Sequence, residues 1–162
     1  MRMPPRFAML DRRIHFLSEE AEMSNGVIAR RFFEEVFSKG NLELVDELFA
    51  SDYIGHPSGY EEATRGQEGV KDYVRGLRTG VSDLTVTVED QVDDGDKIVT
   101  RWTAKGTHDG ELMTIPATQR AATVTGITIQ RLHDRRIVEG WTNWDLMGML
   151  QQLGVAPGQG QG

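Results

Sequence analysis

The stretch that decides the fold is GITIQRLHDRRIVEGWTNWDLMGMLQQLG, residues 126–154. Within residues 127–132 the side chains alternate at the period of two that is typical of a strand. Asp134 and Arg135 occupy the position of a tight turn, and residues 137–144 have the composition of a second strand. The sequence therefore predicts a β-hairpin in this part of the chain.

A short helix is expected directly after the hairpin. Asp145 is placed to cap its first turn, because a carboxylate can accept from the free backbone N–H groups there, and Gly154 is placed to end it. Trp141, Asn143 and Trp144 lie just before the helix start, so we expect the hairpin to form one wall of a pocket. The apolar residues at helical spacing are Leu146, Met149, Leu150 and Leu153.

The remainder of the chain predicts helices first and strands afterwards. A helical pattern starts at Asn25 and stops before Gly40, and further helices are expected over residues 42–49 and 66–77. Helices gathered on one face of a strongly curved sheet leave a hollow between the two layers, so we expect an α+β domain with an internal pocket. The expected extended segments are residues 51–64, 84–89, 97–106, 112–115 and 121–132.

Length and composition limit the class of protein. The chain has 162 residues, no cysteine and a net charge of −7. One domain with a real core is expected at this length. The lack of cysteine excludes disulfides and thiolate metal sites, and the negative charge argues against a nucleic-acid partner. No apolar run reaches the roughly 20 residues that span a bilayer, so no membrane partner is expected, and the cytoplasm is the simplest location.

The two ends of the chain are expected to lie outside the domain. Residues 1–22 contain arginines followed by acidic residues, without the apolar run of a secretory signal, and predict an N-terminal extension. Residues 155–162 are rich in Gly and Gln and predict a disordered tail. The domain itself is expected to span residues 23–154.

Three segments carry a family resemblance: IARRFFEEVFSKGNLELVDELFASDYIGHP (28–57), RWTAKGTHDGELMTIPATQR (101–120) and IVEGWTNWDLMGMLQQLG (137–154). Together they resemble the SnoaL-like polyketide cyclases (ester cyclases) of the NTF2-like superfamily. The resemblance implies a cone-shaped, curved antiparallel or mixed sheet packed against N-terminal helices around an apolar pocket. It also implies a homodimer through the outer sheet surface, a small polyketide-like carbonyl ligand, and chemistry that needs no cofactor.

The resemblance also identifies positions where this chain departs from the family. The characterised cyclases close a ring by intramolecular aldol chemistry, in which a carboxylate removes a proton and neighbouring groups hold the enolate. The acid–base Asp of those enzymes aligns with Thr142, and the His that accompanies it aligns with Thr128. A threonine hydroxyl ionises at far too high a pH to serve as a general base, so the cyclase mechanism does not carry over intact.

The remaining candidates for acid–base catalysis are His56 and Asp145. An imidazole titrates near neutral pH, although His56 could equally be a hydrogen-bonded loop residue, and Asp145 could act only as the helix cap. Glu139 has the opposite strand parity to Thr142 and is expected to face away from the pocket, and His108 is expected to be solvated in a turn. The predicted ligand-binding residues are Tyr53, Tyr73, Arg101, Trp102, Thr128, Trp141, Thr142, Asn143 and Trp144.

Two functions follow from these observations. The first is a SnoaL-like ester cyclase that acts on a small apolar carbonyl substrate by cofactor-independent acid–base chemistry. The alternative is a non-catalytic ligand-binding protein, which the threonines at positions 128 and 142 favour. Other reactions of the superfamily, such as isomerisation, need converging carboxylates that the sequence does not offer. No metal site is expected, because the four histidines are dispersed.

Overall fold

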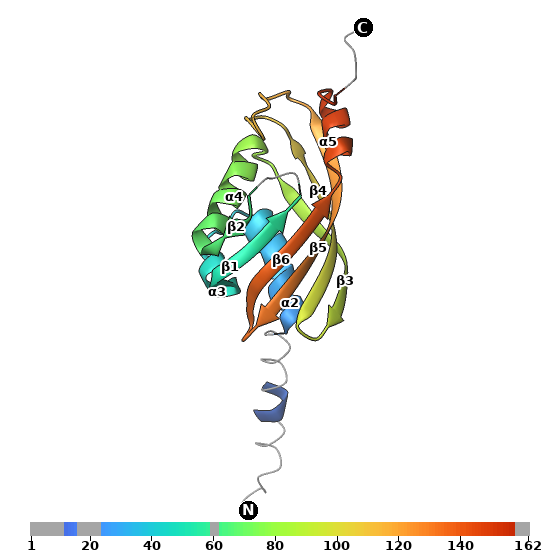
Figure 1. Cartoon of the computed structure of the whole chain (residues 1–162). Coiled ribbons are helices and arrows are strands. Elements are labelled where there is room, and N and C mark those ends of the chain that lie inside the picture. Colours follow the sequence, from blue (N-terminus) through green and yellow to red (C-terminus); the bar gives the residue numbers. More distant parts are fainter. Residues whose placement is uncertain (1–11, 16–23, 59–61, 158–162) are drawn as a thin grey trace, which may run out of the picture.

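In the computed structural model, residues 12–15, 24–58 and 62–157 are described. The helices precede most of the strands, as the sequence predicts, and a short helix closes the domain (Figure 1). In chain order the elements are α2 (Asn25–Arg31), η1 (Phe32–Phe37), α3 (Leu44–Leu48), β1 (Phe49–Pro57), β2 (Thr64–Arg65), α4 (Gly66–Gly80), β3 (Thr85–Asp94), β4 (Lys97–Thr107), β5 (Ala121–His133), β6 (Arg136–Trp144) and α5 (Leu146–Leu153).

The first predicted helix is divided into two kinds of helix. Ser24 caps α2 by accepting a hydrogen bond from the backbone N–H of Val27 at 3.3 Å. The turn that follows, η1, is a wider π-helix, which ends with the N–H of Ser38 donating to the carbonyl of Phe33. The phenylalanines of η1 are buried, and Phe32 packs edge-on against Phe37 with ring centroids 4.6 Å apart.

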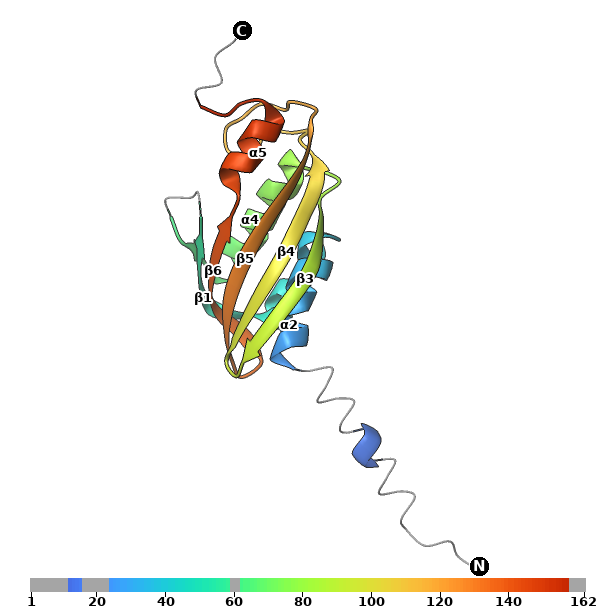
Figure 2. The same cartoon turned by 90° about the vertical axis from the view of Figure 1, so that its right-hand side faces the viewer.

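The strands form one six-stranded sheet in the order β2-β1-β6-β5-β4-β3. The β1 strand runs parallel to β6, and every other pairing is antiparallel, so the sheet is mixed. The sheet curves strongly, with α2, η1, α3 and α4 against one face and α5 at one end (Figures 1 and 2). This arrangement confirms the predicted α+β class and leaves the opposite face of the sheet uncovered within the described residues.

The hairpin and closing helix that the sequence predicts are confirmed. The turn between β5 and β6 consists of Asp134 and Arg135, both with positive φ (47° and 60°), which is the geometry that matches the twist of antiparallel strands. The carboxylate of Asp145 accepts from the backbone N–H of Gly148 at 2.8 Å and caps α5. Gly154 ends that helix in the left-handed conformation.

Two apolar clusters hold the layers together. The larger joins the helices to the sheet, and the smaller lies beneath α5 and contains Leu112, Val124, Met149 and Leu153. Members of both clusters also line one internal cavity. The two clusters therefore share one hollow between them.

Little of the two predicted end segments falls within the described residues. Of the extension predicted over residues 1–22, only residues 12–15 are described, and residues 158–162 of the predicted tail lie outside the description. Ala156, which the sequence placed in the tail, is buried. None of the helices in the described part of the chain is long and apolar enough to cross a membrane.

Candidate functional site

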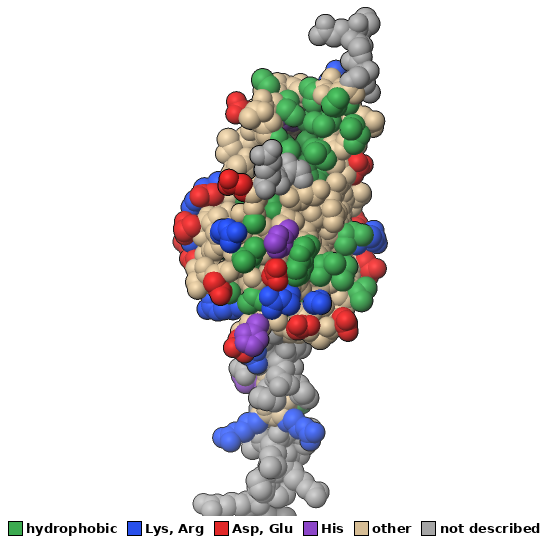
Figure 3. Space-filling model, viewed as in Figure 1, with side chains coloured by type: hydrophobic (Ala, Val, Ile, Leu, Met, Phe, Trp, Pro, Cys, Tyr) green, Lys and Arg blue, Asp and Glu red, His purple; other side chains and the backbone are tan. Residues whose placement is uncertain are grey.

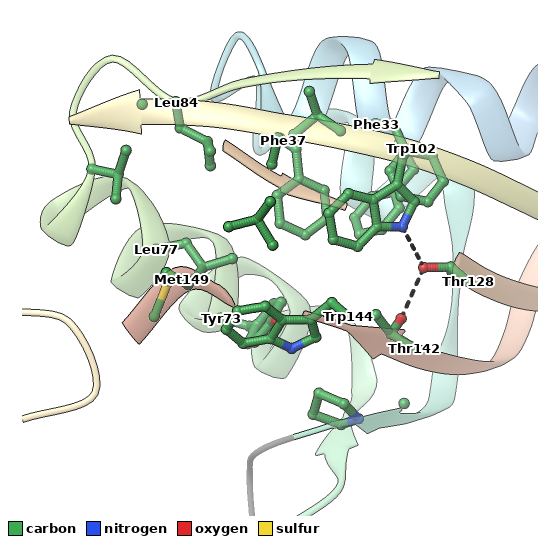
Figure 4. Close-up of a pocket in the computed structure, with 18 of the residues that line it drawn as sticks. Phe33, Phe37, Tyr73, Leu77, Leu84, Trp102, Thr128, Thr142, Trp144 and Met149 are labelled. Carbon is green, nitrogen blue, oxygen red and sulfur yellow. Dashed lines mark hydrogen bonds between the residues drawn. The ribbon is translucent and has the colours of Figure 1, made fainter. Parts of the chain in front are cut away.

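The candidate site is a cavity of about 150 Å³ between the helices, the concave face of the sheet and α5 (Figure 4). A dry apolar cavity of this volume can hold a benzene-sized ring. Most of its lining is aromatic or aliphatic, so a bound molecule would gain most of its affinity from burial of apolar surface. Apolar lining residues include Phe33, Phe37, Leu77, Leu84, Trp144 and Met149.

A chain of three polar side chains interrupts this apolar lining (Figure 4). The indole Nε1–H of Trp102 donates to the hydroxyl of Thr128 at 3.0 Å, and the hydroxyls of Thr128 and Thr142 lie 3.0 Å apart. Each hydroxyl has one proton to donate. Since the contact between the two hydroxyls uses one of those protons, the other O–H remains available to a molecule in the cavity.

Strand parity and the pairing register of β4, β5 and β6 bring these three side chains together. Thr128 and Thr142 are direct partners in the β5–β6 ladder, on the face of the sheet toward the helices. Trp102 is the β4 partner of Gly126. A Cβ atom at Gly126 would overlap the six-membered ring of Trp102, so the glycine allows the indole to lie flat across the sheet and reach Thr128.

Tyr53 supplies another neutral polar group to the lining. Burial raises the pKa of its hydroxyl, and the negative charge of Glu139 raises that pKa further, so the phenol keeps its proton. A Cβ at Gly55 or at Gly140 would lie 2.6 or 2.8 Å from the phenol oxygen. Both glycines are therefore needed for the tyrosine to occupy this position.

Two further lining residues are buried polar groups that the sequence did not identify. Gln130 is 1% exposed, and within the described residues its Oε1 has no hydrogen-bond partner. His108 is 2% exposed, so the prediction that it is solvated is wrong. The prediction failed because residues 118–120, distant from the GTHDG turn in sequence, pair with the backbone of His108, and Thr118 also bonds to its imidazole.

Carboxylates are absent from the cavity lining, as far as the described residues show. Asp145 is exposed and caps α5, so its predicted structural role is confirmed, while its catalytic role stays a prediction. Glu139 faces away from the cavity as predicted, and hydrogen bonds from Arg131 (3.0 Å) and His56 (3.2 Å) lower its pKa. Across the described residues, no group of three His, Asp or Glu could hold a metal ion.

The structure separates the predicted site residues into two sets. Tyr53, Tyr73, Trp102, Thr128, Thr142 and Trp144 line the cavity. Trp144 also donates its indole N–H to the carbonyl of Ser58 at 3.0 Å, which fixes its ring. Trp141 and Trp144 lie on opposite faces of the sheet, as strand parity predicts.

The other predicted residues lie toward the outer face. The imidazole of His56 stacks on the ring of Trp141, with centroids 5.6 Å apart, and both contribute with Asn143 to a separate surface hollow. His56 also borders the cavity, but its side chain is 43% exposed and bonded to Glu139. Arg101 is exposed and lies outside the cavity lining. The structure therefore does not bring His56 and Asp145 together inside the cavity.

Comparison with known proteins identifies the family. The sequence model of the SnoaL-like polyketide cyclases matches residues 27–153, which is most of the chain. The chain belongs to the SnoaL-like polyketide cyclase family. Among functionally curated proteins, none matches it significantly.

Solved structures support this family and its NTF2-like fold. IdmH from Streptomyces antibioticus, a candidate polyketide cyclase, is 36% identical, with a TM-score of 0.70 over 82% of this chain and 99% of that one. A candidate SnoaL-like cyclase from Jannaschia sp. CCS1 is 22% identical, with a TM-score of 0.75 over 82% and 93%. A protein of ketosteroid isomerase-like fold from Catenulispora acidiphila is 17% identical (TM-score 0.69; 83% and 97%). The last two comparisons show the shared fold alone.

Proposed function

We propose that this member of the family binds a small, largely apolar carbonyl compound of the polyketide type in its cavity. The single observation that carries the proposal is the Trp102–Thr128–Thr142 chain, which offers one free hydroxyl proton inside an otherwise apolar pocket. A carbonyl oxygen accepts such a proton and has none to give. The rest of the ligand would contact aromatic and aliphatic side chains.

These three hydrogen-bonded side chains support ligand binding more directly than they support ring closure by the family's mechanism. Donated hydrogen bonds can hold a carbonyl or an enolate oxygen. Proton removal from carbon needs a base, and the described lining contains no carboxylate. Of the two imidazoles in the lining, that of His56 is hydrogen-bonded to Glu139 and that of His108 accepts from the N–H of Thr118. A non-catalytic ligand-binding role is therefore the function that the described side chains support best.

Family membership favours a second candidate, a cofactor-independent ester cyclase in which His56 and Asp145 supply acid–base groups. Its test is turnover of a model keto ester by wild-type protein, His56→Ala and Asp145→Asn, with the cyclised product quantified by chromatography. A loss of about a hundredfold or more in either variant would support that assignment, since general acid–base catalysis typically contributes at least this much. Unchanged turnover in both would eliminate these residues.

We also propose that the outer face of the sheet is a homodimer interface. Hydrophobic side chains gather on this face (Figure 3), and Ile127 and Ile129 of β5 are 48% and 37% exposed there. Apolar patches of this kind commonly mark protein interfaces. Sedimentation of wild-type protein and of Ile127→Asp tests the proposal, and a wild-type monomer at all concentrations would contradict it. A cytoplasmic location stays a prediction from the sequence.

The binding proposal is tested with octan-2-one and 2-methyloct-1-ene, which share a shape although only the ketone has an acceptor oxygen. Dissociation constants are measured by tryptophan fluorescence for wild-type protein and for the Trp102→Phe/Thr128→Val/Thr142→Val triple variant, because replacement of the threonines alone would leave the indole N–H of Trp102 free to donate to the ketone. We expect the ketone-to-alkene affinity ratio to fall about fivefold in the triple variant, the value of one net hydrogen bond. The two ligands differ in the free-energy cost of dehydration, but this difference is the same for both proteins. It therefore cancels when the ratio is compared between them. An unchanged ratio would refute the proposal.

A further inference from the structure

The hydroxyl of Tyr53 lies over the backbone of two paired strands. Gly55 of β1 and Gly140 of β6 are direct partners in the ladder, and both line the cavity. A Cβ at Gly55 would lie 2.6 Å from the phenol oxygen, and a Cβ at Gly140 would lie 2.8 Å from it. The phenol ring packs edge-on against Phe49, with ring centroids 4.8 Å apart. These contacts fix the hydroxyl at the cavity wall, above the two glycines.

This hydroxyl is a donor without an acceptor. Within the described residues, the fully enclosed side-chain polar atoms that lack a hydrogen-bond partner are Nε2 of His108 and Oε1 of Gln130. The Tyr53 hydroxyl also makes no hydrogen bond to these residues, but it is not one of the enclosed atoms, so it keeps accessible surface toward the cavity. An O–H group in apolar surroundings without an acceptor costs free energy that a ligand oxygen would recover.

Tyr53 lies on the same part of the sheet as Thr128 and Thr142 (Figure 4 shows the two threonines). Gly140 precedes Thr142 by two residues on β6, so the two positions share a face and lie roughly 7 Å apart. Since the phenol oxygen is within 2.8 Å of the Cβ position of Gly140, it lies roughly 4–10 Å from the Thr142 side chain. Two O–H groups can share one acceptor oxygen when they are up to roughly 5.5 Å apart, which the lower part of this range provides.

We propose that Tyr53 is the second donor of the site, and that its hydroxyl and the free hydroxyl proton of the Thr128–Thr142 pair bind the same carbonyl oxygen of the ligand. A carbonyl oxygen has two lone pairs and accepts both bonds. The carbonyl group is then held from β1 and from β6 at once, which fixes its direction as well as its position. This inference rests on the proposed function and adds a residue from a different strand to the same site.

The first test needs no ligand. Tyr53→Phe removes the hydroxyl and keeps the ring, and because the hydroxyl has no partner in the protein, the midpoint of urea unfolding should stay the same or rise. Thr128→Val is the matched comparison, since that hydroxyl has two partners and its loss should lower the midpoint. A fall of about 0.5 M in Tyr53→Phe, as expected for the loss of one hydrogen bond within the protein, would overturn the inference.

The second test observes the carbonyl of bound octan-2-one directly. Isotope-difference infrared spectra, with unlabelled and ¹³C-carbonyl ketone, isolate the C=O stretching band, which moves to lower frequency with each hydrogen bond that the oxygen accepts. We expect the band in wild-type protein to lie below that of the ketone in hexane, and to move part of the way back in Tyr53→Phe. The ketone-to-alkene affinity ratio should fall about fivefold in the same variant. A substitution that acted only on the packing of the protein would not move the band.

The outcomes of the infrared test separate this inference from the proposed function. A band that moves in the Trp102→Phe/Thr128→Val/Thr142→Val variant but not in Tyr53→Phe refutes the role of Tyr53 and leaves the proposed function standing. A band that the triple variant leaves unchanged refutes the proposed function and, with it, the shared oxygen. A shift toward the hexane position in each variant, completed when all four substitutions are combined, is the result that the inference predicts.

Discussion

Replacement of Thr128 by Val removes the central hydroxyl of the polar chain while keeping the shape of the side chain. Thr128 is 5% exposed, accepts the indole N–H of Trp102 at 3.0 Å and contacts Thr142 at 3.0 Å. The substitution leaves the indole N–H without its partner inside an apolar cavity, which costs about 1–3 kcal/mol. Thr142→Val is the matched control, since it removes only the terminal hydroxyl and should cost about 1 kcal/mol or less.

Urea unfolding followed by tryptophan fluorescence measures both variants. With an m-value of about 2 kcal/mol per molar urea, a loss of 2 kcal/mol lowers the midpoint by about 1 M. The indole N–H resonance of Trp102 should also shift in Thr128→Val and remain nearly unchanged in Thr142→Val. If Thr142→Val were the more destabilising substitution, or if the indole resonance did not move in Thr128→Val, the argument for a directed chain from Trp102 to Thr142 would be wrong.

Three further predictions concern the residues around the site. Gly126→Ala should displace the ring of Trp102, because a Cβ there overlaps the indole, and should lower the free energy of unfolding by about 1–3 kcal/mol. Asp145→Ala should remove the cap of α5 and cost about 1 kcal/mol, measured by thermal unfolding. Asp83 accepts from the backbone N–H (2.7 Å) and hydroxyl (2.9 Å) of Thr107, which lowers its pKa. A lowered folded-state pKa gives stability that is present above the unfolded pKa and lost as pH falls through the folded pKa. The loss of stability below about pH 4 should therefore be shallower in Asp83→Asn.

Each of these predictions has a control. Gly76 lies in α4 with open space around its Cβ position, so Gly76→Ala should stabilise the protein by about 0.5–1 kcal/mol while Gly126→Ala destabilises it. Asp145→Asn keeps a capping side chain and should cost less than Asp145→Ala. Equal costs for the two would contradict the cap, and parallel pH–stability curves for wild-type protein and Asp83→Asn would contradict the role of Asp83.

Local pattern was sufficient to predict most of the fold. The hairpin turn, the cap at Asp145 and the stop at Gly154 depend on residues close together in sequence, and all three are confirmed. Strand parity also placed Glu139 outside the cavity. The same rule applied to β4 could have placed Arg101 outside, since it is the neighbour of the inward-facing Trp102.

The site residues that the sequence misplaced depend on long-range contacts. His108 lies in a turn sequence, yet residues 118–120 bury it, and no local signal reports a loop that folds over another. Gln130 lies two residues after Thr128 and so has the same strand parity, which predicts that it also faces the pocket. It was nevertheless not recognised as a polar group there. The side chain of His56 faces Glu139 and Trp141 because β1 pairs in parallel with β6, and that pairing cannot be read from the sequence of β1.

The central claim is that the ligand's carbonyl oxygen meets the hydroxyls of Thr128 and Thr142 inside the cavity. A crystal structure of the protein with octan-2-one tests this most directly. We predict electron density for the ketone between Trp102 and Met149, with its oxygen about 2.5–3.0 Å from the hydroxyl of Thr128 or Thr142. A ketone bound in the cavity with its oxygen away from both hydroxyls, or bound only in the surface hollow beside His56, would contradict the claim.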